Sequence, residues 1–349
     1  MGGAQHVCID LCSAAIENGH EVAVASMEGG YLWDQLKPEV KKYQLKNMVK
    51  SIMPLKDIRV FFEIKCVIKD FKPDIIHLHS SKAGVLGRLA CLFHSSHIVY
   101  TVHGFDSIRI QHRIFLPFEK ILQHFCGAII GVSKYDYKNL IAEKISRNVS
   151  YIYNGIEEPT KADLDSNIKE VAGQRPIVMT IGRIAYQKNL DLFLHVAKSY
   201  GDGALFIWIG GSVEETMDEV KAEHDIPQNV LLLGDIPNAS ALIGNCTVFS
   251  LFSKYEGLPI TIIEALSAGK PVVASNVGGI SELVDNSNGF LADENIDSIV
   301  NNLKTIIGNA DKQKEMGEAS RKKYEESFTL SNMWEKYHEQ YLKLTIKNK

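Results

Sequence analysis

Short apolar runs alternate with segments of helical periodicity along almost the whole chain. In the first half, the apolar runs predict strands at 21–26, 74–78, 97–102, 128–133 and 149–155. In the second half, they predict strands at 177–181, 205–209, 230–233, 247–251 and 272–275. Strands that alternate with helices form parallel, doubly wound α/β sheets, whose ligands bind at the carboxyl ends of the strands. We therefore expect functional residues in the loops that follow these strands.

The alternation runs through two series, which predicts two domains in a chain of 349 residues. The polar segment 157–175 is the predicted linker, so the N-terminal domain covers 1–156 and the C-terminal domain 176–331. A final helix, 332–349, is expected to return to the first domain. The chain enters a helix directly after Gly2 and Gly3, and no strand precedes them. Either the sequence starts late, or this domain lacks its first strand and is unstable and inactive.

Composition and charge argue against several classes of protein. A net charge of −4 is unlike that of a dedicated nucleic-acid binder. No apolar run approaches 18 residues and no signal peptide is evident, which favours an intracellular location. Six scattered cysteines without a CxxC pair fit a reducing cytosol. The chain has neither G-x-G-x-x-G nor G-x-x-x-x-G-K-S/T, which counts against a nicotinamide dehydrogenase and a P-loop enzyme.

The stretch 253–271 carries the clearest candidate chemistry. It predicts a loop, a short helix from Pro259 and a stop at Gly269. Glu256 lies just before this helix and Glu264 lies inside it. The free N–H groups and the dipole at a helix N-terminus favour an anion. We therefore predict that a nucleotide diphosphate binds here, with both carboxylates at the same site.

Arg183 and Lys188 lie in the loop after the predicted strand 177–181. Two cations at the carboxyl edge of a sheet can hold a diphosphate, arginine as a planar fork and lysine as a point charge. The alternative is a solvated loop with ordinary surface charges.

Two patterns that could suggest a metal ion are assigned no metal. His77 and His79 form an H-x-H pair without a third ligand, so we predict packing and loop roles for them. Asp163 and Asp165 form an Asp-x-Asp triplet, but it lies in the predicted linker rather than after an apolar strand. We treat that triplet as a coincidence.

Residues 37–72 form a basic segment with ten Lys or Arg and four acidic residues. Apolar residues such as Phe61, Phe62 and Val67 are interleaved with the cations. A basic, apolar surface of this kind can contact an anionic membrane. The alternative is a solvated helix face whose other side packs in the core.

Several motifs occur in the order that one enzyme family shows. They are Gly2-Gly3-Ala4 with Gly19-His20-Glu21-Val22, Thr101-Val102-His103-Gly104, Asn154-Gly155-Ile156, Gly182-Arg183 with Lys188, and Ser253-x-x-Glu256-Gly257-x-Pro259 with Glu264. Together they resemble the retaining glycosyltransferases of the large GT-B family 4. The stretch 79–88 further resembles bacterial members that build capsule, O-antigen or other surface glycans on a lipid carrier.

The resemblance implies two Rossmann-like domains facing across a cleft, with a nucleotide-diphosphate sugar, UDP-sugar favoured, held mainly by the second. Arg183 and Lys188 would stabilise the departing diphosphate. Glu256 would orient the donor sugar, and Glu264 would accept hydrogen bonds from the ribose hydroxyls. The remaining implied donor-binding residues of this domain are Gly257, Leu258 and Ile260.

For the N-terminal domain, the resemblance implies that His103 contacts the donor sugar near the reacting carbon. The other implied residues are Gly2 and Gly3 beside the diphosphate, and Ser81, Lys82 and Arg88 at phosphates of the acceptor. For Gly2 and Gly3 the alternative is an ordinary βα turn, and for Lys82 and Arg88 it is a helix-terminal cation and a surface arginine. The acceptor would be a glycan or a polyprenyl-diphosphate-linked glycan, which places a cytoplasmic enzyme at the inner face of the cell membrane.

The implied reaction is hexosyl transfer by front-face displacement, without an essential metal or cofactor. The paired carboxylates are therefore not interpreted as the acid and base of a hydrolase. Two alternatives stay open: a GT-B epimerase or phosphorylase, and a non-catalytic protein that binds a nucleotide sugar.

Overall fold

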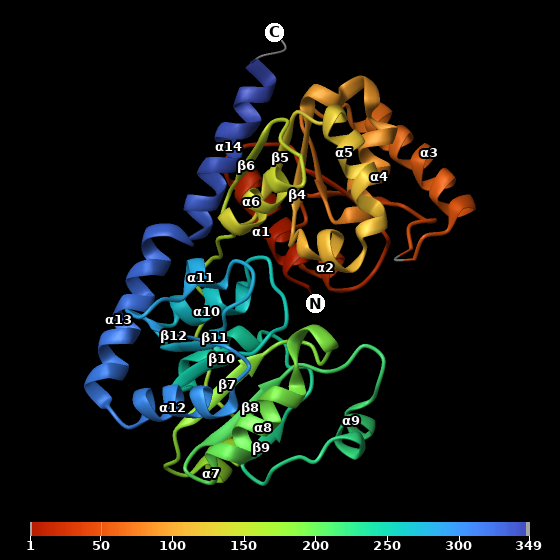
Figure 1. The fold of residues 1–349 in the computed structure, drawn as a ribbon. Coiled ribbons are helices and arrows are strands. Elements are labelled where there is room, and N and C mark those ends of the chain that lie inside the picture. Colours follow the sequence, from red (N-terminus) through yellow and green to blue (C-terminus); the bar gives the residue numbers. More distant parts are fainter. Residues whose placement is uncertain (1, 50, 347–349) are drawn as a thin grey trace. The chain divides into compact units, whose positions relative to one another are not determined.

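The computed structural model describes residues 2–49 and 51–346, so Lys50 of the basic segment and the extreme chain ends lie outside the described residues. The chain divides into two compact units (Figure 1). Unit 1 comprises Met1–Ile156 and Leu330–Lys349, and unit 2 comprises Glu157–Thr329. Among the described residues, no helix is both long enough and apolar enough to cross a bilayer.

Unit 1 contains two parallel sheets covered by helices. Its strands are β1 (Ala23–Ser26), β2 (Lys41–Gln44), β3 (Ile76–His79), β4 (Ile98–Val102), β5 (Ala128–Gly131) and β6 (Val149–Tyr151). Its helices are α1 (Gly3–Glu17), α2 (Tyr31–Gln35), α3 (Pro54–Phe71), α4 (Ser81–Ala90), α5 (Leu116–Leu122), α6 (Lys134–Ala142) and α14 (Leu330–Ile346). Short turns of helix are η1 (Leu92–His97), η2 (Ser107–Gln111), η3 (Arg113–Phe115) and η4 (Gln123–Phe125).

The strands of unit 1 pair in register as β1-β2 and as β3-β4-β5-β6. In the described part of the chain, β1 and β3 therefore belong to different sheets. Every residue of β4 and β5 is buried, as the continuous apolar runs in these strands predict. The C-terminal helix α14 contacts α1 and η1 and belongs to unit 1. Its tyrosines reach the strands β3 and β4, where they become part of a polar cluster described below.

Unit 2 is a single six-stranded parallel sheet with helices packed against it. Its strands are β7 (Ile177–Ile181), β8 (Leu205–Ile209), β9 (Val230–Leu232), β10 (Val248–Leu251), β11 (Val272–Ser275) and β12 (Gly289–Ala292). Its helices are α7 (Ser166–Ala172), α8 (Leu190–Tyr200), α9 (Met217–Glu223), α10 (Ile260–Ser267), α11 (Ile280–Leu283), α12 (Ile296–Ile307) and α13 (Ala310–Ser327), with short turns η5 (Tyr186–Lys188) and η6 (Ala239–Asn245). The strand β12 was not predicted from the sequence.

The strand order β12-β11-β10-β7-β8-β9 determines where a ligand can bind. From β7 the chain moves outward through β8 and β9, and then returns to β10 and moves outward in the opposite direction. The neighbouring strands β7 and β10 therefore flank the topological switch point. The loops that leave the carboxyl ends of these two strands diverge there, and open α/β sheets bind their ligands at such a point.

The predicted linker 157–175 is wrong as a separate segment. It belongs to unit 2 and contains α7, whose first turn is capped by Asp165 accepting a hydrogen bond from the N–H of Asn167. Leu164 is buried, and the N–H of Ala162 donates to the carbonyl of Ala241 at 2.9 Å. The polar composition reflects a surface segment that nevertheless packs against η6.

The basic segment 37–72 does not form one uniform surface. Residues 41–44 are the strand β2, and α3 packs against α4 with Val60 fully buried. The same helix also exposes large apolar side chains, among them Leu55 at 79% and Phe62 at 59%. The helix α3 therefore has features of both alternatives. One side packs in the core, as expected for a solvated helix, and its outer side is apolar as well as basic, as expected for a membrane contact.

Candidate functional site

The loops after β7 and β10 meet through an ion pair at the switch point of unit 2. Lys188, the last residue of η5, places its Nζ 2.5 Å from Oε1 of Glu256. The side chain of Glu256 is 8% exposed and that of Lys188 17%. The structure thus brings together two of the residues that the sequence analysis singled out, although 67 residues separate them in the chain.

Backbone contacts hold these two loops together. The N–H of Lys254 donates to the carbonyl of Gln187 at 2.8 Å, and Nε2 of Gln187 donates to the carbonyl of Tyr255 at 2.9 Å. Gly182 packs beside Lys188, where an added Cβ would lie 3.5 Å from the lysine side chain. The lysine and the glutamate are therefore positioned by rigid neighbours as well as by their mutual attraction.

A third loop, after β11, contacts the backbone of Glu256 and Gly257, and it was not predicted from the sequence. Gly278 has φ +59°, and an added Cβ would lie 1.8 Å from the carbonyl oxygen of Glu256. The N–H of Gly279 donates to the carbonyl of Gly257 at 2.8 Å. Only glycine permits this left-handed backbone and this close approach. The Gly278-Gly279 pair, separated by two residues from the end of the apolar strand β11, was the signal that could have revealed the loop.

Arg183 lies in the same loop as Lys188 but has a different environment. Its side chain is exposed, and across residues 2–49 and 51–346 no hydrogen bond or ion pair of its guanidinium is found. Its backbone passes close to Gly210, which has φ +130° and whose added Cβ would lie 2.3 Å from the carbonyl oxygen of Gly182. The fold therefore fixes the backbone of Arg183 and leaves its five N–H donors available to an anion.

The helix α10 begins at Ile260, with Pro259 as the preceding cap residue, one position later than predicted. Gly257 and Leu258 lie in the loop before it, and Glu264 lies on its second turn at 8% exposed. Within the described ranges, Oγ of Ser253 and Oγ1 of Thr261 are buried hydroxyls without a hydrogen-bond partner. Buried hydroxyls are rarely left unpaired, so these two mark the start of α10 as a place where polar ligand atoms fit.

In unit 1, His103 belongs to a polar cluster at the carboxyl ends of β3 and β4. Its Nε2 lies 2.9 Å from Nδ1 of His79. His77 continues the cluster, with ring nitrogens 2.7 Å from the hydroxyl of Tyr341 and 2.7 Å from that of Thr101. Tyr337 of α14 also bonds to Thr101, at 2.9 Å. The H-x-H pair thus has packing and hydrogen-bonding roles.

The cluster is electrically neutral near pH 7. Desolvation lowers the pKa of His79 to about 4, because the surrounding protein disfavours a charged ring. Desolvation is also the largest cause that holds the pKa of His77 and of His103 well below the ordinary value, and the neighbouring histidines lower both further. His103 can therefore donate or accept a hydrogen bond, but it carries no charge toward a substrate.

The structure corrects the assignment of Arg88 and narrows that of Lys82. Arg88 is completely buried, and its guanidinium forms two 2.8 Å hydrogen bonds to the carboxylate of Glu119, so it is neither an acceptor contact nor a surface arginine. Lys82 pairs with Asp57 at 2.6 Å and donates to the carbonyls of residues 49 and 51, which ties α4 to the start of α3. The third predicted acceptor residue, Ser81, is exposed at the start of α4.

Gly2 and Gly3 lie at the start of α1. Gly2 is the cap residue, and an added Cβ would meet nothing within 4 Å, so the backbone is open on that side. The N–H of Gly2 donates to Oε1 of Gln5 at 3.2 Å. Their predicted contact with a diphosphate stays a prediction.

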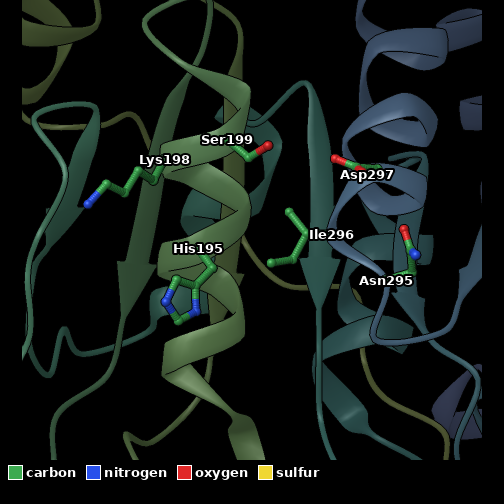
Figure 2. A pocket seen from close by; sticks show the side chains of 6 residues that line it. All are labelled: His195, Lys198, Ser199, Asn295, Ile296 and Asp297. Atoms are coloured by element: carbon green, nitrogen blue, oxygen red, sulfur yellow. The ribbon is translucent and has the colours of Figure 1, made fainter.

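A surface hollow of unit 2 lies apart from these loops. Figure 2 shows that it is lined by His195, Lys198 and Ser199 of α8 and by residues 295–297 at the start of α12. None of these residues belongs to the loops that carry Arg183, Lys188 or Glu256. We assign this hollow no role. Among the described residues, no three His, Cys, Asp or Glu side chains are grouped as metal ligands, and the expectation that no metal is required stays a prediction.

Comparisons with known families cover nearly the whole chain. Residues 1–158 match the family described as Glycosyltransferase Family 4, and residues 162–323 match Glycosyl transferases group 1. The two matches correspond to the two α/β series of the sequence.

Curated bacterial relatives resemble the chain along most of its length. A UDP-Gal:alpha-D-GlcNAc-diphosphoundecaprenol alpha-1,3-galactosyltransferase of Escherichia coli is 30% identical over 88% of this chain and 85% of its own. The capsular polysaccharide biosynthesis glycosyltransferase CapM of Staphylococcus aureus is 24% identical over 87% of both chains.

Solved structures share the fold. HepE of Anabaena, crystallised with UDP and glucose, superposes with a TM-score of 0.82 at 20% identity and covers 97% of this chain and 95% of its own. A sucrose-phosphate synthase of Thermosynechococcus elongatus superposes with a TM-score of 0.84 at 16% identity, over 99% and 94%. Each unit is thus Rossmann-like, and the two together form the GT-B fold.

Proposed function

The chain belongs to glycosyltransferase family 4, and from this premise we propose that it transfers a hexose, with retention, from a nucleotide-diphosphate sugar to a lipid-linked or glycan acceptor in surface-polysaccharide synthesis. The observation that carries the donor assignment is the Lys188–Glu256 pair at the switch point of unit 2, beside the exposed Arg183. UDP is the favoured nucleotide, because the E. coli relative uses UDP-galactose and HepE binds UDP.

The proposed roles follow the charges of the site. Arg183 and Lys188 stabilise the negative charge that develops on the departing diphosphate, together with the N–H groups at the start of α10. Glu256 accepts hydrogen bonds from hydroxyls of the donor sugar, and its ion pair holds Lys188 in place. Glu264 accepts hydrogen bonds from the ribose hydroxyls. These residues supply the charge stabilisation that a metal ion supplies in other transferases, so no metal is expected to be essential.

The proposed chemical step is a front-face displacement. The bond from the anomeric carbon to the diphosphate oxygen breaks, and a bond to the acceptor hydroxyl forms on the same face, through an oxocarbenium-like state. The departing oxygen takes the proton of the acceptor. His103, uncharged, orients the donor sugar by a hydrogen bond near the reacting carbon.

The proposed acceptor and the proposed location of the enzyme rest on the bacterial relatives and on the exposed side chains of α3. The relatives act in O-antigen and capsule synthesis, and one acts on a diphosphoundecaprenol-linked sugar. We propose an acceptor of the same class, a cytoplasmic enzyme at the inner face of the cell membrane, and a peripheral contact through residues 37–72. Support comes from α3, which exposes Leu55, Ile58 and Phe62 beside Arg59 and Lys65.

A thermal-shift screen of nucleotide sugars tests the donor assignment. A true donor binds the folded state and raises the melting temperature by mass action, with about 2.7 kcal/mol of added stability at a hundredfold excess over Kd. We expect a shift with a UDP-sugar that is reduced in Glu264→Ala. If UDP-, GDP- and ADP-sugars all leave the melting temperature unchanged, the donor site is wrongly assigned. Analysis of the product then separates transfer from epimerisation or phosphorolysis.

A further inference from the structure

The helix α5 and the turns before it present an apolar surface on both of their sides. Leu116 and Leu122 face the core of unit 1. The opposite side exposes Ile110 at 60%, Ile114 at 76%, Phe118 at 58% and Ile121 at 60%, together with Phe115. We call these five exposed residues the α5 face. A cluster of large apolar side chains at the surface is ordinarily covered by other protein or by lipid.

Additional apolar and basic side chains surround the α5 face. Phe93 of η1, exposed at 94%, belongs to a turn that contacts η4 directly after α5. Arg113 and Lys120 both pair with Glu143, at 3.0 and 3.8 Å. Gln123 holds the adjacent loop through the carbonyl of Lys144 and the N–H of Arg147, and both of these cationic side chains are exposed. Four cations therefore surround this face against one partly buried carboxylate.

Acidic residues are excluded from the surface of this part of the chain. Between residues 75 and 135 the only acids are Asp106 and Glu119. Both are buried, Asp106 beside Arg109 and Glu119 beside Arg88. The exposed side chains around α5 are thus apolar, basic or neutral. An apolar centre within a cationic rim matches an anionic lipid surface, where rings and aliphatic chains enter the interface and cations bind phosphates.

We propose that the α5 face, with Lys144 and Arg147 at its edge, is the surface by which unit 1 docks on an anionic lipid bilayer. This deepens the proposed membrane contact, and it assigns the main contact to a segment outside the basic region 37–72. Helix α4 contacts both α3 and α5, and Figure 1 shows the three as neighbouring helices of unit 1, so α3 can contribute to the same contact. A second copy of the chain fits less well, because a two-fold contact would bring the cationic rims together.

Vesicle co-sedimentation tests the docking surface with the full chain. The probes are vesicles of phosphatidylcholine alone and with phosphatidylglycerol, each at low and high salt. The test variant is Phe118→Ser with Ile121→Ser, the charge variant is Lys144→Glu with Arg147→Glu, and the matched control is Leu55→Ser with Phe62→Ser in α3. We expect the α5-face and charge variants to bind phosphatidylglycerol vesicles about tenfold more weakly, and the control less than threefold more weakly.

Four outcomes would overturn this assignment. The first two are that the wild-type chain does not bind anionic vesicles, and that the α5-face variant binds them as strongly as wild type does. The third is that the α3 control loses more binding than the α5-face variant. The fourth is that light scattering shows a wild-type dimer that Phe118→Ser dissociates. Nucleotide-sugar thermal shifts of the same variants should match wild type. A chain that binds vesicles but no nucleotide sugar would contradict the proposed function and leave the docking surface intact.

A second inference comes independently from the histidine cluster and rests on the role proposed for His103. His79 is the last residue of β3, its register partner is Thr101 on β4, and its Nδ1 bonds to Nε2 of His103. The rings stack with centroids 5.2 Å apart. Because each neutral ring has one N–H, whichever ring donates in this bond determines where the proton of His103 lies.

We infer that His79 is a positioning residue that fixes the ring and tautomer of His103. His77 stabilises it in turn, with ring centroids 4.0 Å apart, and is itself bound to Thr101 and Tyr341. His79 thus acts through His103 and need not touch substrate.

The test compares His79→Phe, which keeps a ring but no hydrogen bond, with His79→Asn, whose amide can replace Nδ1. In His79→Phe we expect kcat to fall about five- to tenfold with the donor KM nearly unchanged, and His79→Asn to restore most of it. Nitrogen-15 NMR of the His103 ring should show a single tautomer in wild type and a mixture in His79→Phe. If His103→Ala lowers kcat while His79→Phe leaves kcat and the tautomer unchanged, this inference is wrong. A fully active His103→Ala variant would instead refute the proposed role of His103.

Discussion

The two units place different chemistry at the carboxyl ends of their strands. Unit 1 has a neutral network of three histidines, a threonine and two tyrosines, in which every contact is a hydrogen bond or a ring contact. Unit 2 has a charged pair, Lys188 and Glu256, beside the exposed Arg183. The neutral groups lie on or next to the strands β3 and β4, whereas the charged groups lie in loops. A neutral network can orient a substrate by hydrogen bonds, whereas the charged loops also supply full charges that can stabilise a charge developing during a reaction.

The physical reason for this difference is desolvation. Burial holds the pKa values of the unit 1 histidines down, so they stay uncharged at the end of a packed sheet. Lys188 and Glu256 keep part of their exposure and compensate each other, which limits the desolvation cost of two ions.

Substitution of Glu256 by alanine should have the largest effect. It leaves the ammonium of Lys188 largely buried without its partner, which costs about 3–5 kcal/mol in a buried pair, and it removes the proposed contact to the donor sugar. Transfer should fall about a thousandfold, measured as kcat/KM. In the double variant Lys188→Met with Glu256→Gln, stability should recover while activity does not. If the double variant recovers activity, the Lys188–Glu256 pair has no role in catalysis.

Gly278→Ala should displace Glu256 without changing any charged group. Its new Cβ would lie 1.8 Å from the carbonyl oxygen of Glu256, in a backbone conformation that alanine disfavours, at a cost of about 2–3 kcal/mol. Urea unfolding and turnover measure the effect. Gly244→Ala is the matched control, because its added Cβ meets nothing within 4 Å. Equal stability of the two variants would contradict the supporting role of the third loop.

Arg183→Ala should lower kcat about 10- to 100-fold and leave stability unchanged. The side chain is exposed, so its loss disrupts no packing but removes the N–H donors that we propose stabilise the leaving diphosphate. Steady-state kinetics with the donor identified by thermal shift provide the measurement. If turnover of Arg183→Ala is normal, the charge on the leaving diphosphate is stabilised by Lys188 and backbone N–H groups without Arg183.

Glu264→Ala should weaken donor binding by about 1–3 kcal/mol, because the ribose hydroxyls would lose a charged acceptor. Calorimetric titration with the free nucleotide isolates this contact from the chemistry. Glu282→Ala, a change on the next helix α11, serves as the comparison. An unchanged nucleotide affinity in Glu264→Ala would place this carboxylate outside the site.

Acidification should destabilise unit 1 through its neutral histidines. The pKa of His79 is about 4 in the folded state and about 6.5 in the unfolded state, so the unfolded state binds the proton first. The stabilisation is fully present above pH 6.5 and is lost as the pH falls toward 4, at about 1.4 kcal/mol per pH unit for each such histidine. Urea unfolding at pH 7, 6 and 5 should show this slope, and His79→Asn should reduce it. A flat profile in wild type would contradict a neutral cluster.

The sequence predicts the loops of the proposed donor site because their parts are local. Arg183 and Lys188 directly follow an apolar strand, and Glu256 precedes a short helix with a clear stop at Gly269. The positions of these residues at strand ends followed from periodicity alone. The helix α10 begins one residue later than predicted, and the strand β12 was not predicted, because Gly289–Ala292 contains only two large apolar residues, Phe290 and Leu291.

The errors concern residues whose partners are distant in the chain. The sequence predicts Arg88 at a phosphate of the acceptor, with a surface arginine as the alternative, yet Glu119 lies 31 residues later and pairs with it inside the core. The segment 157–175 read as a linker, since its polar composition does not reveal the contact of Ala162 with Ala241. A single sequence contains no information on which distant residue will compensate a charge.

The sequence by itself determined the alternating α/β architecture, the family, and the two loops that carry Arg183, Lys188 and Glu256. Short-range spacing encodes these features, because periodicity and capping depend on neighbours within a few residues. Only the tertiary structure decided that Lys188 and Glu256 form one ion pair, that His103 is coupled to His79, and that the outer side of α5 is uncovered. Strand order and helix packing bring those groups together or leave them exposed, and both depend on contacts between residues far apart in the chain.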